Sequence, residues 1–350
     1  MQNKKMQMKN IYIIFFILFI FSCKPESTKE TVKIDDKLEQ NILRMAKSYF
    51  TPLEAIKIKN LSPDRKKMIE LGKRLFYDKR LSENKTVNCA SCHDMNKYGV
   101  DNLPVSPGDK NQFGTRNTPT VLNAFLQYAQ FWDAHARTVE DQCVGPIFGN
   151  FEMDMPDTIT LLSRLEKDAY YKKTFAEVFP KADTSISITT LKRAIGAFER
   201  TLVTPAPFDK YLKGDLQAIS NKAKLGVKAF VDNGCIPCHS TSIVGGQMAQ
   251  KFALYGYYWD YTNSEHIDKG RYRFTKDPGD KFVFKVPQLR NVVKTYPYFH
   301  DGSVSDLKEA IKIMGMAETN IQLKQEDVDN ILEFFKTLTG HIPDYAFENK

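Results

Sequence analysis

Two copies of one five-residue motif, Cys-x-x-Cys-His, constrain this chain more than any other feature. The motif occupies residues 89–93 and recurs at 235–239. Two cysteines three positions apart can each form a thioether bond to a haem vinyl group, and the histidine that follows supplies an axial nitrogen to the iron. The residues predicted to hold two covalent haems are Cys89, Cys92, His93, Cys235, Cys238 and His239.

Two other kinds of site use paired cysteines. A four-cysteine zinc site would use both pairs, but it would not require a histidine immediately after each. A redox dithiol usually follows a strand in a thioredoxin-like pattern, which this sequence lacks. One such motif in 350 residues can be accidental, whereas two in matching surroundings favour a di-haem c-type cytochrome.

Residues 1–23 have the pattern of a targeting segment, with basic residues followed by an apolar run over 11–21. This run is too short to span a bilayer as a stable helix. The ending Ile-Phe-Ser-Cys at 20–23 resembles a bacterial lipobox, in which cleavage precedes a cysteine that becomes lipidated. An ordinary signal peptide with an incidental cysteine is the alternative. Both predict export, so we expect a periplasmic protein that contacts the membrane only through a lipid on Cys23.

The composition argues against nucleic acid as a partner. The formal charge is +8, but three lysines that contribute to it lie in the first 23 residues, and acidic residues are mixed evenly with basic ones elsewhere. Residues 24–60 are predicted to be a tether and lead-in, because 24–40 are rich in Lys, Glu, Ser and Thr. The remaining cysteine, Cys143, is interpreted as a small buried side chain, with a reactive thiol as the alternative.

The segments before the two motifs repeat one helical pattern. Ser62 and Pro63 are typical of a helix start, and the residues that follow have helical spacing. A Leu-Gly pair with a Phe four residues after the glycine occurs at 71–76 and again at 225–230. The glycine leaves room for another helix or a haem edge. The repeat indicates an internal duplication with an insertion.

Each half also closes with an amphipathic pattern, at 191–202 and at 328–335, before a breaker run at 204–207 and a glycine at 340. A start helix, a haem loop and a closing helix resemble the cytochrome c fold. We therefore predict a mainly α chain of two cytochrome c-like domains, each with one covalent haem c. The predicted N-terminal domain covers 61–204 and the C-terminal domain 205–350.

Ordered blocks elsewhere in the chain carry a family resemblance. They are RNTPTVLN (116–123), QFWD (130–133), Gln142, GP (145–146), FEM (151–153), AFERTL (197–202), FDKY (208–211), FKVP (284–287), LRN (289–291) and PYFHDGS (297–303). With the two haem motifs, these blocks resemble the bacterial di-haem cytochrome c peroxidases over about residues 60–340. That family is related to the maturation enzyme of methylamine dehydrogenase.

The resemblance implies distinct roles for the two haems. The N-terminal haem would be the peroxidatic site, and the C-terminal haem would be the high-potential entry point for electrons. Met314 matches the sixth ligand of the second haem iron, with Met316 as the substitute if the register differs. A thioether ligand favours ferrous iron and raises the potential. Taken alone, a methionine in this position is more often a core side chain at helical spacing.

The resemblance also assigns catalytic residues. Trp132 matches a tryptophan between the haems, and a purely structural aromatic is compatible with that position. Gln142 and Glu152 match the distal pair of the peroxide pocket. Peroxide must lose one proton where it binds and gain one on the leaving oxygen, which a carboxylate can move while an amide orients the substrate.

A calcium ion between the two domains is a further implication. Asn117, Thr295 and Pro297 match its ligands, which would be one side-chain oxygen and two backbone carbonyls, all hard donors. From the sequence alone, ordinary turn residues are the simpler interpretation.

The sequence departs from the family pattern at two positions. Many members carry a histidine sixteen residues after the first motif histidine, in the loop that closes the resting site, and this chain has Asp109 there. The family's Trp-Asp-Gly-Arg block is altered at 132–135, where the arginine is replaced by His135. We interpret His135 as a weaker haem propionate partner, with iron ligation as the remote alternative.

Together these observations predict a peroxidase that reduces hydrogen peroxide to water with electrons from a small c-type cytochrome or copper protein. A homodimer is possible, because relatives commonly dimerise. Two other functions stay open. A plain electron-transfer cytochrome would not turn over peroxide, and a maturation-type oxidase acting on a protein would favour tyrosine, not Met314, on the second haem.

Overall fold

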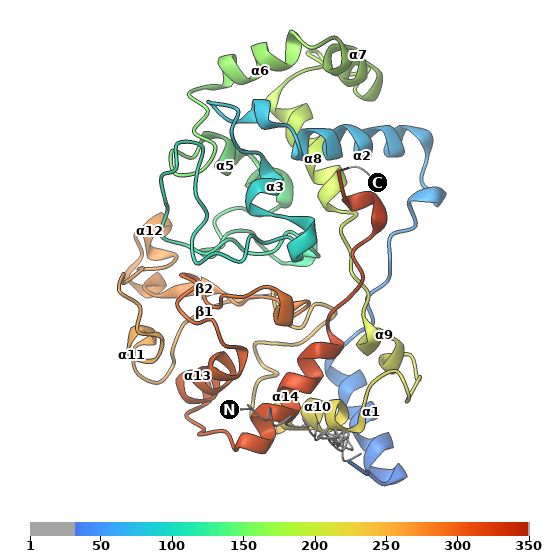
Figure 1. The fold of residues 1–350 in the computed structure, drawn as a ribbon, viewed down its shortest axis with the longest axis vertical. Coiled ribbons are helices and arrows are strands. Elements are labelled where there is room, and N and C mark those ends of the chain that lie inside the picture. The colour runs from blue at the N-terminus through green and yellow to red at the C-terminus, as the bar shows by residue number, and fades with distance from the viewer. Residues whose placement is uncertain (1–31, 349–350) are drawn as a thin grey trace, which may run out of the picture. The chain divides into compact units, whose positions relative to one another are not determined.

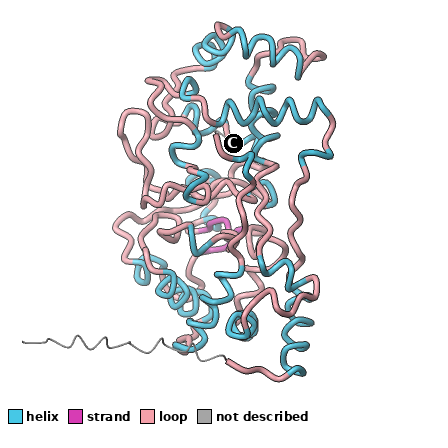
Figure 2. Tube along the Cα trace, turned by 45° about the vertical axis from the view of Figure 1, so that its right-hand side comes forward, coloured by secondary structure: helices cyan, strands magenta, loops and turns pink. Residues whose placement is uncertain are grey.

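The computed structural model describes residues 32–348, and residues 33–348 belong to one compact unit. Helices and loops make up nearly all of it (Figures 1 and 2). The α-helices in the described part are α1 (Asp36–Tyr49), α2 (Pro63–Phe76), α3 (Cys89–Cys92), α4 (Val139–Gln142), α5 (Val144–Phe148), α6 (Thr158–Glu166), α7 (Ala169–Val178), α8 (Ile188–Glu199), α9 (Pro207–Leu212), α10 (Asn221–Asp232), α11 (Tyr258–Thr262), α12 (Tyr272–Thr275), α13 (Leu307–Thr319) and α14 (Gln325–Thr337). The prediction of a mainly α chain is confirmed.

Two helix pairs show the duplication directly, since α2 packs on α8 and α10 packs on α14 (Figure 1). A Cβ built on Gly72 of α2 would lie 1.9 Å from the carbonyl oxygen of Ala194 in α8. A Cβ on Gly226 of α10 would lie 1.9 Å from the carbonyl oxygen of Asn330 in α14. Both glycines therefore serve the close helix approach that the sequence repeat predicts.

The start of α2 forms as the sequence predicts. Ser62 accepts a hydrogen bond at its Oγ from the backbone N–H of Arg65, and Pro63 occupies the first turn. The duplicated helix α10 is capped in the same way by Ser220, whose Oγ accepts from the N–H of Ala223. These caps fix where each helix begins, and therefore how far each lies from its haem motif.

The predicted tether is wrong for residues 36–40, which belong to α1. Asp35 caps this helix, and its apolar face, with Ile42 and Ala46 buried, packs against α9 and α10. Glu39 forms an ion pair with the buried Lys224 of α10. The polar composition of 24–40 hid this helix, because only Leu38 of its apolar stripe falls within that range.

One buried ion pair connects α9 to the loop after the second strand. Asp209 in α9 accepts hydrogen bonds at both oxygens from the guanidinium of Arg290, each 2.7 Å long. Asp209 also accepts from the backbone N–H of Leu53 and of Ala206. A buried pair of charges is tolerated only when such further hydrogen bonds complete it. This network fixes the lead-in segment and the loop to α9.

The only sheet within residues 32–348 is a two-stranded one. β1 (Ala249–Lys251) pairs antiparallel with β2 (Val283–Lys285), and Ala249 lies opposite Lys285. The backbone N–H of Lys285 donates a hydrogen bond to the carbonyl of Trp132, at 2.6 Å. This hydrogen bond holds the end of β2, with Lys285, against the segment that contains Trp132.

None of the helices within residues 32–348 is both long and apolar enough to cross a bilayer. The predicted boundary between 204 and 205 falls in the segment between α8 and α9, and two separate cytochrome c-like domains remain a prediction.

Candidate haem and peroxide site

The two motif histidines are held in the same way. His93 Nδ1 lies 3.2 Å from the carbonyl oxygen of Gly99, and His239 Nδ1 lies 3.4 Å from that of Val244. A carbonyl only accepts, so each Nδ1 carries the proton and each Nε2 is free to bind a metal. Desolvation lowers the pKa of both rings, that of His239 to about 4. Both histidines are therefore neutral ligands at neutral pH.

The four motif cysteines lack the low thiol pKa that is typical of redox-active cysteines. Burial raises the pKa of every one of these thiols, that of Cys92 to about 11 and that of Cys235 to about 12. Redox-active cysteines have a lowered pKa instead. Among residues 32–348, no group of three or more His, Cys, Asp or Glu side chains is arranged to hold a metal ion.

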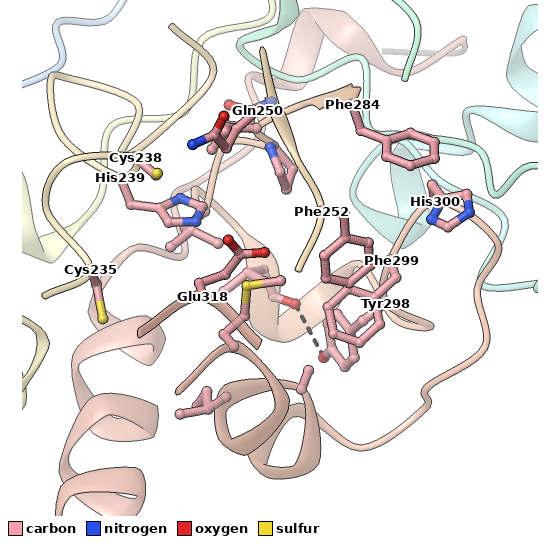
Figure 3. A pocket seen from close by; sticks show the side chains of 18 of the residues that line it. Cys235, Cys238, His239, Gln250, Phe252, Phe284, Tyr298, Phe299, His300 and Glu318 are labelled. Atoms are coloured by element: carbon pink, nitrogen blue, oxygen red, sulfur yellow. Dashed lines mark hydrogen bonds between the residues drawn. The ribbon is translucent and has the colours of Figure 1, made fainter. Parts of the chain in front are cut away.

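A cavity of about 430 Å³ opens beside the second motif, within the size range of cofactor sites. Cys235, Cys238 and His239 line one side of it, and Phe252, Phe284 and His300 line the opposite side (Figure 3). Much of the remaining wall consists of apolar side chains from α13, from α14 and from the segment 284–299. Such a cavity fits a flat apolar cofactor attached at the two cysteines.

Met314 faces this cavity from α13, whereas Met316 is absent from its lining. One turn further along α13, the carboxylate of Glu318 also lines the cavity and accepts a hydrogen bond from the backbone N–H of Ala253, at 2.8 Å. Desolvation raises the pKa of Glu318. The geometry supports Met314 over Met316 as the predicted sixth ligand.

Two polar residues of this cavity had no role in the sequence prediction, although both lie in the blocks that carry the family resemblance. Lys285 is buried, and desolvation lowers its pKa to about 7. Its Nζ donates to Gln127 Oε1 at 2.5 Å. His300 is only 1% exposed, and neither ring nitrogen has a hydrogen-bond partner. Buried polar groups of this kind normally have partners, so the cavity is built to receive an acidic or hydrogen-bonding group there.

Trp132 lines the same cavity beside these residues. Its indole Nε1–H donates to the carbonyl of Asn117 at 2.8 Å, and its ring lies edge-on to His300, with ring centroids 6.5 Å apart. The backbone of Asn117 in turn donates to the carbonyl of His300, at 2.7 Å. Trp132 is thus fixed where the N-terminal loop meets the wall of the second cavity.

The two predicted peroxide residues flank α5. Gln142 ends α4 and is half-buried, and Glu152 follows the turn after α5. Glu152 is exposed as a residue, but its carboxylate folds back, so that a Cβ built on Gly149 would lie 2.5 Å from its Oε2. Desolvation raises the pKa of Glu152, while the charge of His135 acts to lower it. The carboxylate also interacts electrostatically with Cys92 of the first motif.

Asp109 does not face an open site. Its carboxylate accepts hydrogen bonds from the backbone N–H of Asn84 (2.6 Å), the N–H of Thr86 (3.1 Å) and the Thr86 hydroxyl (2.5 Å). Desolvation would raise the pKa of Asp109, but these hydrogen bonds hold it below its usual value. The N–H of Asp109 donates to the carbonyl of Glu152 at 2.7 Å. The loop is therefore docked against the Glu152 segment.

The three predicted calcium ligands, Asn117, Thr295 and Pro297, all line the cavity of the second motif. The Asn117 amide nitrogen donates to the carbonyls of Leu103 and Pro104, at 2.9 and 3.3 Å. These hydrogen bonds turn its Oδ1 the other way. The calcium site remains a prediction.

Two cysteines lie outside the haem motifs. Cys143 is buried at the junction of α4 and α5, and burial raises the pKa of its thiol well above the usual value. This agrees with an inert packing role. Cys23, the predicted lipidation site, lies outside the described residues.

Comparisons with known proteins agree with this geometry. The family model for di-haem cytochrome c peroxidases matches residues 66–217. The chain is 43% identical over 275 residues to cytochrome c551 peroxidase of Pseudomonas aeruginosa, covering 78% of this chain and 79% of the relative. It is 39% identical over 291 residues to cytochrome c551 peroxidase of Nitrosomonas europaea, covering 82% and 84%.

Among solved structures, a MauG-like protein associated with microbial copper homeostasis superposes with a TM-score of 0.71 at 28% identity. The match covers 86% of this chain and 96% of that protein. The sequence relatives cover most of the chain at 39–43% identity, and the second haem motif lines the cavity described above. The chain belongs to the di-haem cytochrome c peroxidase family, and it is a peroxidase.

Proposed function

We propose that this peroxidase reduces hydrogen peroxide to water, with electrons from a small periplasmic c-type cytochrome or copper protein. The observation that carries the proposal is the matched pair His93 and His239. Each ring has its Nδ1 tied to a backbone carbonyl and its Nε2 free, and each follows two half-buried cysteines. This arrangement suits two covalent haems, one in each of two cytochrome c-like domains.

The described residues fit these haems. Cys235, Cys238 and His239 would attach and ligate the second haem, and Met314 would complete its ligation from α13. Lys285 and His300 would receive its acidic propionate groups, since in the described part of the chain the buried Lys285 amine has only Gln127 as a hydrogen-bond partner and neither buried ring nitrogen of His300 has one. Cys89, Cys92 and His93 would hold the first haem. The bound haems would supply the iron that binds peroxide and the electron-transfer chemistry.

Side chains of the protein would transfer the protons of the reaction. Reduction of one hydrogen peroxide takes up two protons and two electrons and yields two waters. Glu152 would accept the proton from the oxygen that binds and return it to the oxygen that leaves. The half-buried Gln142 would orient peroxide through its amide. Trp132, fixed by Asn117, would lie on the path between the two centres.

Further proposals concern location and assembly. Residues 1–23 would direct export to the periplasm, with a lipid on Cys23 as the membrane anchor. A calcium ion held by Asn117, Thr295 and Pro297 would tie the two haem-binding parts together, since oxygen donors suit this cation. We also propose a homodimer, since relatives commonly dimerise.

The test of the proposed function has two measurements. The denatured mass of the exported protein should show two haem additions, and the purified protein should turn over hydrogen peroxide catalytically with a reduced c-type cytochrome. A protein with two haems that consumes no peroxide would instead be an electron-transfer cytochrome. A haem-free, zinc-loaded protein would end the proposal entirely.

Replacing Met314 with histidine should lower the potential of the second haem and slow electron entry, because a thioether favours ferrous iron more than an imidazole does. The measurement is a spectroscopic redox titration of the purified protein. Met316→His is the matched control, since Met316 lies two residues away outside the cavity lining, and it should leave the potential unchanged. The opposite pattern would assign the ligand to Met316.

A further inference from the structure

A second repeated pattern, Pro-x-x-x-Asn, occurs at 119–123 and again at 287–291. In both copies the asparagine is fully buried and adopts positive φ, 60° at Asn123 and 63° at Asn291. Asparagine tolerates this conformation better than most residues with a side chain. Each asparagine then begins a short 3₁₀ helix, at Ala124–Leu126 and at Val292–Lys294. The internal duplication therefore extends to these two segments.

The first copy packs on the loop whose carbonyl holds the first motif histidine. The Thr120 hydroxyl donates to the carbonyl of Tyr98 at 2.6 Å. The next residue is Gly99, whose carbonyl oxygen lies 3.2 Å from His93 Nδ1. A Cβ built on Gly99 would lie 2.8 Å from the Thr120 hydroxyl, so the segment and the loop are in close contact.

The second copy packs on the equivalent loop of the other half. The N–H of Leu289 donates to the carbonyl of Val244 at 3.1 Å, and the same carbonyl oxygen lies 3.4 Å from His239 Nδ1. A Cβ built on Gly245 would lie 2.4 Å from the carbonyl oxygen of Pro287. Each Pro-x-x-x-Asn segment therefore supports the carbonyl that orients one motif histidine.

The two asparagines meet at a single side chain, that of Thr204. Asn123 and Asn291 each donate from Nδ2 to Thr204 Oγ1, at 2.9 and 3.0 Å. A hydroxyl oxygen has two acceptor lone pairs, and these two donors use both. The N–H of Thr204 donates to Asn123 Oδ1, and that of Gly340 donates to Asn291 Oδ1, both at 2.9 Å. Thr204 is fully buried as well.

The position equivalent to Thr204 in the second half is Gly340. The asparagine N–H groups donate to the carbonyls of Leu202 and Leu338, at 2.8 and 3.1 Å, beyond the ends of α8 and α14. Thr204 and Gly340 each follow two residues later. A Cβ built on Gly340 would lie 2.2 Å from the carbonyl oxygen of Thr204, so that position has no room for a side chain. One hydroxyl therefore serves both halves.

We propose that Thr204 is a positioning residue for both haem sites, whose shared hydroxyl holds the two loops that orient His93 and His239 at a fixed separation. Without this hydroxyl, the amides of Asn123 and Asn291 are left as buried donors that lack an acceptor, which destabilises the structure around each of them. The loops of both halves then loosen together. The part of the inference that concerns haems rests on the proposed function.

The test compares Thr204→Val, which keeps the shape of the side chain and removes the hydroxyl, with Thr204→Ser, which keeps the hydroxyl. Backbone hydrogen exchange of the di-haem protein is followed by mass spectrometry in peptides that cover 120–126 and 287–294. In Thr204→Val, exchange should rise by about tenfold in both peptides, as expected when a buried donor loses its acceptor. In Thr204→Ser both should stay as slow as in the wild type. Peptides from α7 should not change, which separates local loosening from global unfolding.

Electron transfer between the two haems is the second readout, because its rate depends steeply on their separation and a role in packing alone would not alter it. This rate should fall severalfold in Thr204→Val and stay near the wild-type rate in Thr204→Ser. The control is Thr337→Val, which removes a hydroxyl that donates to the carbonyl of Phe334 within α14 at 2.6 Å. It should leave exchange in both peptides and the electron-transfer rate unchanged.

Asn123→Gly tests the same link if Thr204→Val does not fold. Glycine accepts the positive φ, so this variant removes only the side-chain amide, and it should raise exchange at 287–294 in the other half. The inference is overturned by an increase confined to one half, by an equal increase in Thr204→Ser, or by an unchanged exchange or electron-transfer rate in Thr204→Val. If the proposed function fails instead, wild-type protein turns over no peroxide while the exchange pattern of the variants is still observed.

Discussion

Replacing Glu152 with glutamine should lower kcat for peroxide reduction by about 10²–10⁴-fold while both haems stay attached, since this is the usual contribution of a general acid–base group. Glutamine keeps the size of the side chain and its position over Gly149, but it cannot accept a proton. The measurement is steady-state turnover with a reduced c-type cytochrome, together with the haem content of each preparation.

The pH profile gives this prediction a second check. Desolvation raises the pKa of Glu152 above its ordinary value, and the carboxylate is the basic form above that pKa. Wild-type turnover should therefore fall as pH drops through this raised value, and the fall should vanish in Glu152→Gln. Glu166→Gln, at an exposed residue in α6, is the matched control and should behave as wild type. Near-normal turnover in Glu152→Gln would remove this residue from the mechanism.

Local signals made the helical frame predictable from the sequence. Ser62 and Pro63 mark the start of α2 because a cap and its first turn are encoded by neighbouring residues. Gly72 and Gly226 indicate close helix packing, because only a residue without a Cβ leaves room for the backbone carbonyl of the facing helix. The haem motifs are local for the same reason, since two thioethers and one axial ligand fit within five residues.

The parts that escaped prediction depend on distant neighbours. The helix α1 is stabilised through α9 and α10, far along the chain, so its composition alone suggests a tether. Lys285 and His300 are ordinary polar residues in the sequence, and their burial in one cavity wall appears only in the fold. The sequence shows Asp109 where many family members carry a histidine, but its three donors at Asn84 and Thr86 could not be predicted from it.

The hydrogen bonds of Asp109 bear on whether the first haem must be activated by reduction before it reacts with peroxide. A carboxylate already bound by three donors would have to give them up before it could move toward a metal, and charge-assisted hydrogen bonds are the strong ones. The loop is also pinned from its other side, because a Cβ on Gly108 would lie 2.5 Å from the carbonyl oxygen of Phe151. His135, the other conceivable ligand, is held by Asp133 and two rings.

We therefore expect the fully oxidised protein to have an accessible first haem and to react with peroxide without prior reduction. Electron paramagnetic resonance and optical spectra of the oxidised protein should show a high-spin or water-bound first haem. Mixing it with one equivalent of peroxide should give an immediate spectral change. The physical reason is that the closing ligand common in the family is replaced by a side chain whose acceptors are already occupied.

Asp109→His gives the sharpest comparison, because it restores the ligand that the loop lacks and removes the hydrogen bonds to Asn84 and Thr86. This variant should show a low-spin first haem when oxidised, and peroxide reactivity that appears only after the second haem is reduced. Thr86→Val, which removes the hydroxyl donor at 2.5 Å and adds no ligand, separates loosening of the loop from ligation and should stay high-spin. A low-spin, bis-histidine signal in the wild-type protein, with activity only after reduction, would show that the first site is closed despite Asp109.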